Sequence, residues 1–174
     1  MRLFHVSEES EITRFEPRTP TREDLDPNTK LVWAINERCL PNFLTPRNCP
    51  RVAYHCNETT TEEDKQRFLS SQSLQHVVAI EHKWFEIMRS TTLYVYEFDP
   101  AGFYVQESTA GYYVSEITQV PINRIMMDDL FGELINRNVE VRVMDHLWDL
   151  SDKIQQTSFN WSMCRMRFAR GRSQ

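Results

Sequence analysis

The sequence has few glycines, only four in 174 residues, at positions 102, 111, 132 and 171. Three widespread catalytic and nucleotide-binding motifs need glycines at close, fixed spacing. These are the GxGxxG dinucleotide loop, the GxxxxGK[ST] phosphate loop and the GxSxG nucleophile elbow. None of the three occurs here. Any nucleotide site in this chain must therefore be built in another way.

Cysteine is also scarce, and the four cysteines (Cys39, Cys49, Cys56 and Cys164) form no CxxC pair. None of the five histidines forms an HExxH or HxxxH pair, so the sequence predicts no metal site. Few, scattered cysteines are typical of reduced thiols. Together with an N-terminus that becomes acidic by residue 8 without an apolar signal core, they predict a cytoplasmic protein.

Long apolar runs and a basic surface are absent as well. No apolar run approaches the roughly 18 to 20 residues of a membrane helix, so no membrane partner is expected. The net charge of −5 argues against a general nucleic-acid binder. The segment 160–174 carries four arginines and no acid, and its end, 169–174, is predicted to be a solvated basic tail. The sequence leaves the oligomeric state open.

Alternating and helical patterns predict an α+β fold in a single domain, 1–174, with a mixed or mainly antiparallel sheet and short helices. A proline-rich polar stretch, 16–30, is expected to be a long loop that closes over a site as a lid. Strands are predicted at 2–7, 30–35, 51–56, 77–81, 92–98, 103–107, 112–115, 121–126, 139–143 and 159–168. Helices are predicted at 59–69, 82–89, 128–138 and 147–156.

A few polar side chains stand where they could serve chemistry. His5 shares a strand face with Leu3, and it is either a core histidine or a ligand-binding one. Glu116 follows a predicted strand and either faces a cleft or is an exposed edge residue. Arg47 and Arg51 flank a turn, where they either bind an anionic group or pair with the abundant acids.

Three stretches resemble the motifs of the ADP-ribosyltransferase-like fold. Leu3-Phe-His-Val-Ser resembles its first strand, Leu31-Val-Trp-Ala-Ile its second, and Gly111-Tyr-Tyr-Val-Ser-Glu-Ile-Thr-Gln-Val-Pro-Ile its third. Over its whole length the chain resembles a bacterial family of unknown function. In the third stretch, tyrosines occupy the usual place of the catalytic glutamate, and Glu116 would replace it three or four residues later.

The resemblance implies an NAD-using enzyme that cleaves the bond between nicotinamide and ribose. His5 would bind a ribose hydroxyl, Ser7 would support the same ribose, and Trp33 would form a wall beside nicotinamide. Glu116 would accept a hydrogen bond from the 2′-hydroxyl of the nicotinamide ribose and stabilise the oxocarbenium-like charge. The resemblance also makes Arg47 and Arg51 candidates for binding the pyrophosphate.

Two other functions fit the sequence. One is a non-catalytic module on the same fold that binds a small ligand such as a nucleotide, which the displaced glutamate favours. The other is a protein-interaction domain in which His5 belongs to the core. Release of nicotinamide, or binding without release, would distinguish these hypotheses.

Overall fold

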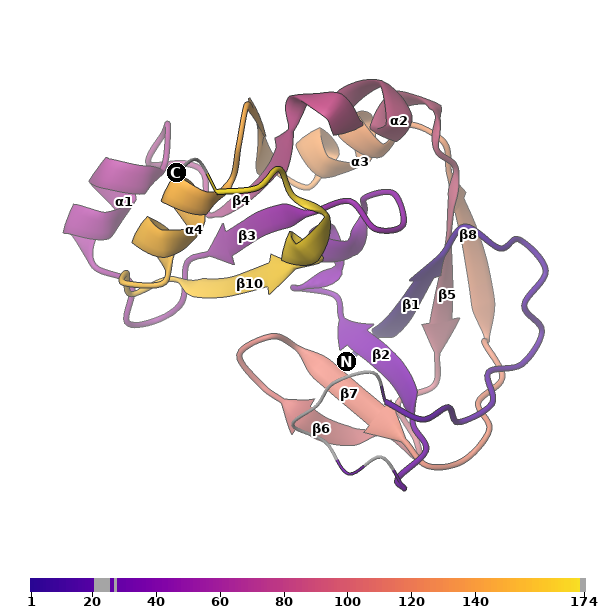
Figure 1. The fold of residues 1–174 in the computed structure, drawn as a ribbon. Coiled ribbons are helices and arrows are strands. Elements are labelled where there is room, and N and C mark those ends of the chain that lie inside the picture. Colours follow the sequence, from indigo (N-terminus) through magenta and orange to yellow (C-terminus); the bar gives the residue numbers. More distant parts are fainter. Residues whose placement is uncertain (21–25, 27, 173–174) are drawn as a thin grey trace. The chain divides into compact units, whose positions relative to one another are not determined.

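The computed structural model describes residues 1–20, 26 and 28–172. Its internal contacts divide the chain into two compact units (Figure 1). Unit 1 comprises Met1–Leu40 and Leu93–Met127, and unit 2 comprises Pro41–Thr92 and Asp128–Gln174. Each unit contains its own β-sheet, and most of the pairing is antiparallel. The predicted α+β class is therefore confirmed, while the assignment of 1–174 to a single domain stays a prediction.

Unit 1 is built on a six-stranded sheet in which every pairing is antiparallel. Its first strand lies in the interior of the sheet, between the second and fifth strands (Figure 1). In spatial order the strands are β6 (Tyr104–Glu107), β7 (Tyr112–Ser115), β2 (Val32–Asn36), β1 (Leu3–Ser7), β5 (Leu93–Phe98) and β8 (Asn123–Met127). The three stretches that carry the resemblance thus lie on neighbouring strands, β1, β2 and β7.

An aromatic cluster lies on the face of this sheet that carries His5. Phe15 comes from the segment after β1, and its ring packs on Tyr96 at 5.3 Å and on Phe98 at 5.0 Å between ring centroids. The Tyr96 hydroxyl donates to the carbonyl oxygen of Glu9 and accepts from the backbone N–H of Ile12. The segment after β1 is therefore fixed onto the sheet by apolar packing and by hydrogen bonds.

The predicted loop 16–30 is only partly described. Its described part is held at both ends, because Phe15 forms a bridge with Gln119 and Arg18 forms one with Leu31. Residues 21–25 and 27, the middle of the predicted lid, lie outside the described residues. The lid remains a prediction.

Unit 2 contains a four-stranded mixed sheet. Its order is β10 (Asn160–Cys164), β3 (Arg51–His55), β4 (His76–Glu81) and β9 (Val139–Met144). The β4–β9 pair is parallel and the other two pairs are antiparallel. The two central strands are buried at every residue, as expected for strands that are covered on both faces.

Short helices complete unit 2. Thr61 caps α1 by accepting from the backbone N–H of Asp64. Asp129 caps α3 in the same way, by accepting from the backbone N–H of Gly132. The α-helices are α1 (Glu62–Phe68), α2 (Phe85–Ser90), α3 (Leu130–Asn136) and α4 (Trp148–Ile154). Three 3-10 turns are η1 (Leu40–Phe43), η2 (His82–Trp84) and η3 (Met166–Phe168).

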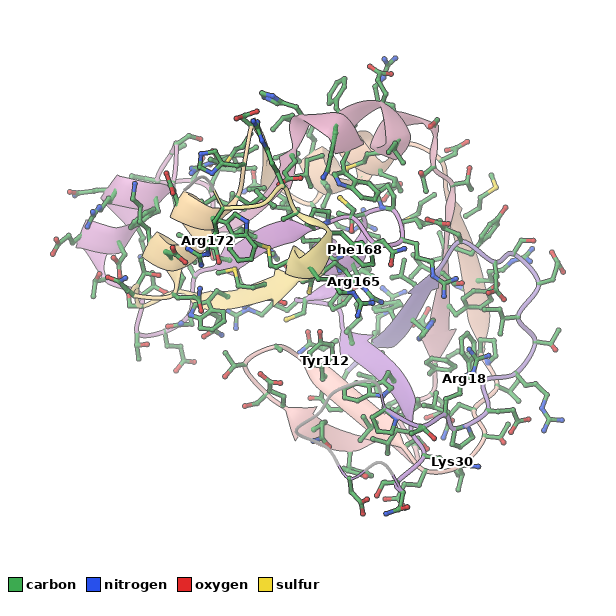
Figure 2. The ribbon with its side chains drawn as sticks, viewed as in Figure 1. Arg18, Lys30, Tyr112, Arg165, Phe168 and Arg172 are labelled. Carbon is green, nitrogen blue, oxygen red and sulfur yellow. The ribbon has the colours of Figure 1, made fainter. Side chains whose placement is uncertain are left out.

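The basic C-terminal segment is bound to acidic side chains of its own unit. Arg170 pairs with Asp145 at 2.7 Å, and Arg172 pairs with Asp152 at 2.6 Å. The guanidinium of Arg172, which Figure 2 labels beside α4, also lies over the ring of Trp148. Both arginines are exposed, yet neighbouring carboxylates balance their charges. Residues 173 and 174 lie outside the described part of the chain.

Across the described residues, every helix is too short or too polar to traverse a lipid bilayer.

Candidate ligand-binding site

His5 lies on the interior strand β1 and is half-buried. Its Nδ1 is 3.0 Å from the backbone carbonyl oxygen of Trp33 on β2. A carbonyl oxygen only accepts hydrogen bonds, so Nδ1 carries the proton and donates. The imidazole ring also packs against Phe15, with 4.8 Å between the ring centroids. Neighbouring groups therefore fix both the position and the tautomer of this histidine.

Burial lowers the pKa of His5 below its usual value of 6.5. The hydrogen bond to Trp33 works in the opposite direction, the positive charge of Arg18 lowers the pKa further, and Glu9 raises it. The net effect keeps the ring neutral at neutral pH. In a neutral imidazole whose Nδ1 is protonated, Nε2 is a hydrogen-bond acceptor. The Nε2 of His5 can thus accept a hydrogen bond from a hydroxyl group of a ligand.

The two predicted partners of His5, Trp33 on the neighbouring strand β2 and Glu116 just after β7, face the other way. Phe4 on β1 is the cross-strand partner of Ile35 on β2, so these two side chains share one face. Trp33 is two residues from Ile35 and lies on that face as well, whereas His5 follows Phe4 directly and points to the opposite face. The sheet therefore brings the backbone of Trp33 to His5, while its indole projects away.

Glu116 lies with Trp33 rather than with His5. One of its carboxylate oxygens accepts from the Tyr104 hydroxyl at 2.9 Å. Tyr104 is the partner of Val114, which in turn is the partner of Trp33, so the three side chains share a face. The indole of Trp33 meets the ring of Tyr112 edge-on, with 5.4 Å between the centroids; Figure 2 labels Tyr112 on β7. The predicted trio of His5, Trp33 and Glu116 thus divides between two faces of one sheet.

Ser7 shares the face of His5, two residues along β1. Its hydroxyl oxygen accepts from the backbone N–H of Glu9 at 3.1 Å. This bond starts the turn that leads the chain from β1 toward Phe15. A role for Ser7 in binding ribose remains a prediction.

The two predicted anion-binding arginines belong to unit 2. Arg51 is 5% exposed, its Nε donates to the carbonyl oxygen of Asn42 at 2.5 Å, and its Nη1 donates to that of Cys49 at 3.0 Å. Its guanidinium also lies over the ring of Phe43. Arg51 therefore holds the η1 segment in place. Arg47 is exposed and lies in the turn before β3.

Replacing Arg51 by methionine is expected to lower the free energy of unfolding by about 2 to 3 kcal/mol, because two buried carbonyl groups lose a charged donor. The exposed Arg47 provides the matched control, and Arg47→Met is expected to change the free energy of unfolding by no more than about 0.5 kcal/mol. Urea unfolding of both variants would measure the difference. Equal losses in the two variants would contradict the structural role of Arg51.

Some residues of the candidate site are not identified by sequence reasoning. Arg18 and Phe15 influence His5 directly but lie at or near the start of the proline-rich loop, where no periodicity predicts their direction. Arg18, labelled in Figure 2, is exposed, and its backbone forms a bridge with Leu31. Tyr104 has a clearer signal. The alternation of 103–107 predicts that its side chain lies on the strand face opposite to that of Val105.

The described residues contain no cluster of side chains that could bind a metal ion. Within residues 1–20, 26 and 28–172, no three histidine, cysteine, aspartate or glutamate side chains are grouped so that they could hold a metal ion. All four cysteines are free thiols.

Residues 4–169 match the family of unknown function DUF6886. This match spans nearly the whole chain. The chain belongs to DUF6886. No curated protein and no solved structure matches this DUF6886 protein.

Proposed function

We propose that this DUF6886 protein binds a nucleotide-type ligand at the His5 face of the unit 1 sheet and that it does not cleave the ligand. The observation that carries the proposal is the fixed tautomer of His5. Its Nδ1 is committed to the carbonyl group of Trp33, so Nε2 is left as an acceptor. A ribose hydroxyl is a donor of the required kind, and the resemblance of Leu3-Phe-His-Val-Ser to a ribose-binding strand supports this assignment.

Charge near His5 also favours a nucleotide. Arg18 is close enough for its positive charge to lower the pKa of His5, and it is exposed. A guanidinium group binds phosphate oxygens in a bidentate manner. A hydroxyl acceptor with a cation nearby matches the neighbouring ribose and phosphate groups of a nucleotide.

The position of Glu116 favours binding over ADP-ribosyl transfer. In such a transfer, positive charge develops on the ribose as nicotinamide leaves, and a carboxylate must lie against that sugar to stabilise it. The carboxylate of Glu116 accepts from Tyr104 on the sheet face opposite to His5. A ligand held by His5 therefore lies on the wrong side of the sheet for this carboxylate.

Proton NMR of the purified protein with NAD tests the proposal, because ligand line-broadening reports binding and free nicotinamide reports cleavage. We expect broadening without nicotinamide, and the same result for Glu116→Gln. His5→Asn is the informative variant. The asparagine amide can still donate to the carbonyl group of Trp33, but it has no hydrogen-bond acceptor at the position of Nε2. The loss of one such hydrogen bond is expected to weaken binding by about tenfold or more.

Controls separate these outcomes. His82→Ala removes an exposed histidine of unit 2 and is expected to leave NAD binding unchanged. Nicotinamide release that Glu116→Gln abolishes would replace the proposal with an ADP-ribosyl transfer activity. Absence of broadening with both NAD and ADP-ribose would refute the nucleotide site and favour a protein-interaction domain.

A further inference from the structure

Strand β9 is the last strand of the unit 2 sheet. It pairs with β4 along one edge, and within the described ranges 1–20, 26 and 28–172 no strand pairs with its other edge. An open edge presents unpaired backbone N–H and C=O groups to another strand. Natural edge strands are often protected by proline or a bulge, and Val139–Met144 contains no proline and no glycine. The edge of β9 is therefore suited to pairing.

The two faces of β9 differ in character. Val141 and Val143 line a shallow groove of about 640 Å³ with Phe85 of α2 and with Phe131 and Ile135 of α3. Arg89, Asp128 and Asp129 also line the groove. Its apolar side chains are accessible, because the exposed fraction is 37% for Val143 and 65% for Ile135. Exposed apolar side chains grouped beside an open strand edge and bordered by charged residues are typical of an interaction surface.

Charged side chains occupy the other face of β9. The guanidinium of Arg142 donates to Glu140 at 2.7 Å and to the carbonyl oxygen of Phe68 at 2.6 Å. Glu140 also accepts from the backbone N–H and the hydroxyl of Ser70. These contacts hold one acid and one base in fixed positions, two residues apart on the same face.

The segment Val139-Glu-Val-Arg-Val is complementary to itself in the antiparallel direction. If two copies pair about Val141, each Val139 faces the other copy's Val143, and each Glu140 faces the other copy's Arg142. Both cross-strand pairs are favourable, since valines meet valines and opposite charges meet. Pairing about Glu140 or about Arg142 would instead place like charges opposite one another, and a register shifted by one residue would place valine opposite charge.

We propose that a second copy of this chain docks edge to edge on β9, so that the two four-stranded sheets continue into one across a twofold axis at Val141. A twofold axis uses the same surface on both partners, which a self-complementary strand provides. Antiparallel partners share a face, so the grooves of both copies and their α3 helices lie on the same side of the joined sheet. The exposed Ile135 side chains then add apolar area to the strand pairing.

Charge reversal with rescue by mixing tests this interface. Sedimentation equilibrium of the wild-type chain is expected to give about twice the monomer mass of 20.8 kDa. Glu140→Arg and Arg142→Glu each place two like-charge pairs in the symmetric dimer, and each is expected to raise the dissociation constant by about tenfold or more. An equimolar mixture of the two variants is expected to dimerise again, because every Arg then faces a Glu of the other copy.

The rescue is diagnostic because a defect within each variant chain would persist in the mixture. Val143→Lys is a second test that leaves Glu140 and Arg142 intact, and it is also expected to give monomers. Trp161→Lys is the matched control, since it alters a 38% exposed apolar side chain on β10 at the other edge of the same sheet, and it should leave the dimer unchanged. A wild-type monomer at the highest soluble concentration would overturn the proposal. A dimer that persists in all three β9 variants, or a mixture that stays monomeric, would also overturn it.

Discussion

Replacing Tyr54 by alanine is expected to lower the free energy of unfolding by about 3 to 5 kcal/mol, the range found when large aromatic residues are truncated in cores. Tyr54 lies on β3, is fully buried, and packs on Phe159 with 5.1 Å between ring centroids. Its hydroxyl donates to the carbonyl oxygen of Phe68 at 2.7 Å. Since small domains are stable by only about 5 to 15 kcal/mol, this loss approaches global unfolding.

Tyr54→Phe separates the two contributions of this side chain. It keeps the ring and removes only the hydroxyl donor, so the expected loss is about 1 to 2 kcal/mol. Urea unfolding followed by circular dichroism would measure both variants. A Tyr54→Phe variant as unstable as Tyr54→Ala would mean that the hydrogen bond, and not the packing of the ring, accounts for the stability.

Most elements of the fold are predictable from local sequence pattern. The strand predicted at 112–115 is observed as Tyr112–Ser115, and the strand predicted at 51–56 is observed as Arg51–His55. The helix predicted at 82–89 is divided into a 3-10 turn and α2. The last strand, predicted at 159–168, ends at Cys164, because Arg165 adopts a left-handed backbone conformation with a φ of 57° and interrupts the extended chain.

Strand pairing is the part that the sequence does not reveal. Period-two alternation shows which residues of one strand share a face, and the expected grouping of Leu3, His5 and Ser7 agrees with the register of β1 against β5. Alternation within one strand does not determine how that face corresponds to a face of another strand. That correspondence depends on register, and a shift of one residue reverses it. The resemblance to the ADP-ribosyltransferase-like fold places His5 and Trp33 at one site, whereas the register of β1 and β2 directs their side chains to opposite faces.

The use of each arginine is also fixed by tertiary contacts. A basic residue in a turn can bind an external anion or the protein's own carbonyl groups, and both uses have the same sequence pattern. Arg51 is committed to the carbonyl groups of Asn42 and Cys49, which lie earlier in the chain than the strand that carries it. Cys49 is only two residues from Arg51, whereas the packing of η1 beside β3 brings the carbonyl group of Asn42 to the guanidinium group.

Replacing Phe15 by alanine is expected to destabilise unit 1 and to raise the pKa of His5. The ring of Phe15 packs on His5, Tyr96 and Phe98, so its removal is expected to cost about 3 to 4 kcal/mol. Burial is the main cause that lowers the pKa of His5, and water in place of the Phe15 ring would favour the charged imidazolium. An NMR pH titration of the His5 ring protons would show the pKa moving toward 6.5.

The same titration predicts a pH dependence of stability. Because the pKa of His5 is lower in the folded chain than in the unfolded chain, the unfolded state binds more protons between the two values. The contribution of His5 to stability is therefore fully present above about pH 6.5 and is lost as the pH falls toward the folded pKa, by at most about 1.4 kcal/mol per pH unit. Phe15→Ala should flatten this slope, whereas Phe15→Leu, which keeps an apolar cover over the imidazole, should retain most of it. If Phe15→Ala leaves the pKa of His5 unchanged, groups other than Phe15 keep the imidazole from water. The Nε2 of His5 would then be less accessible to a ligand hydroxyl than the proposed function requires.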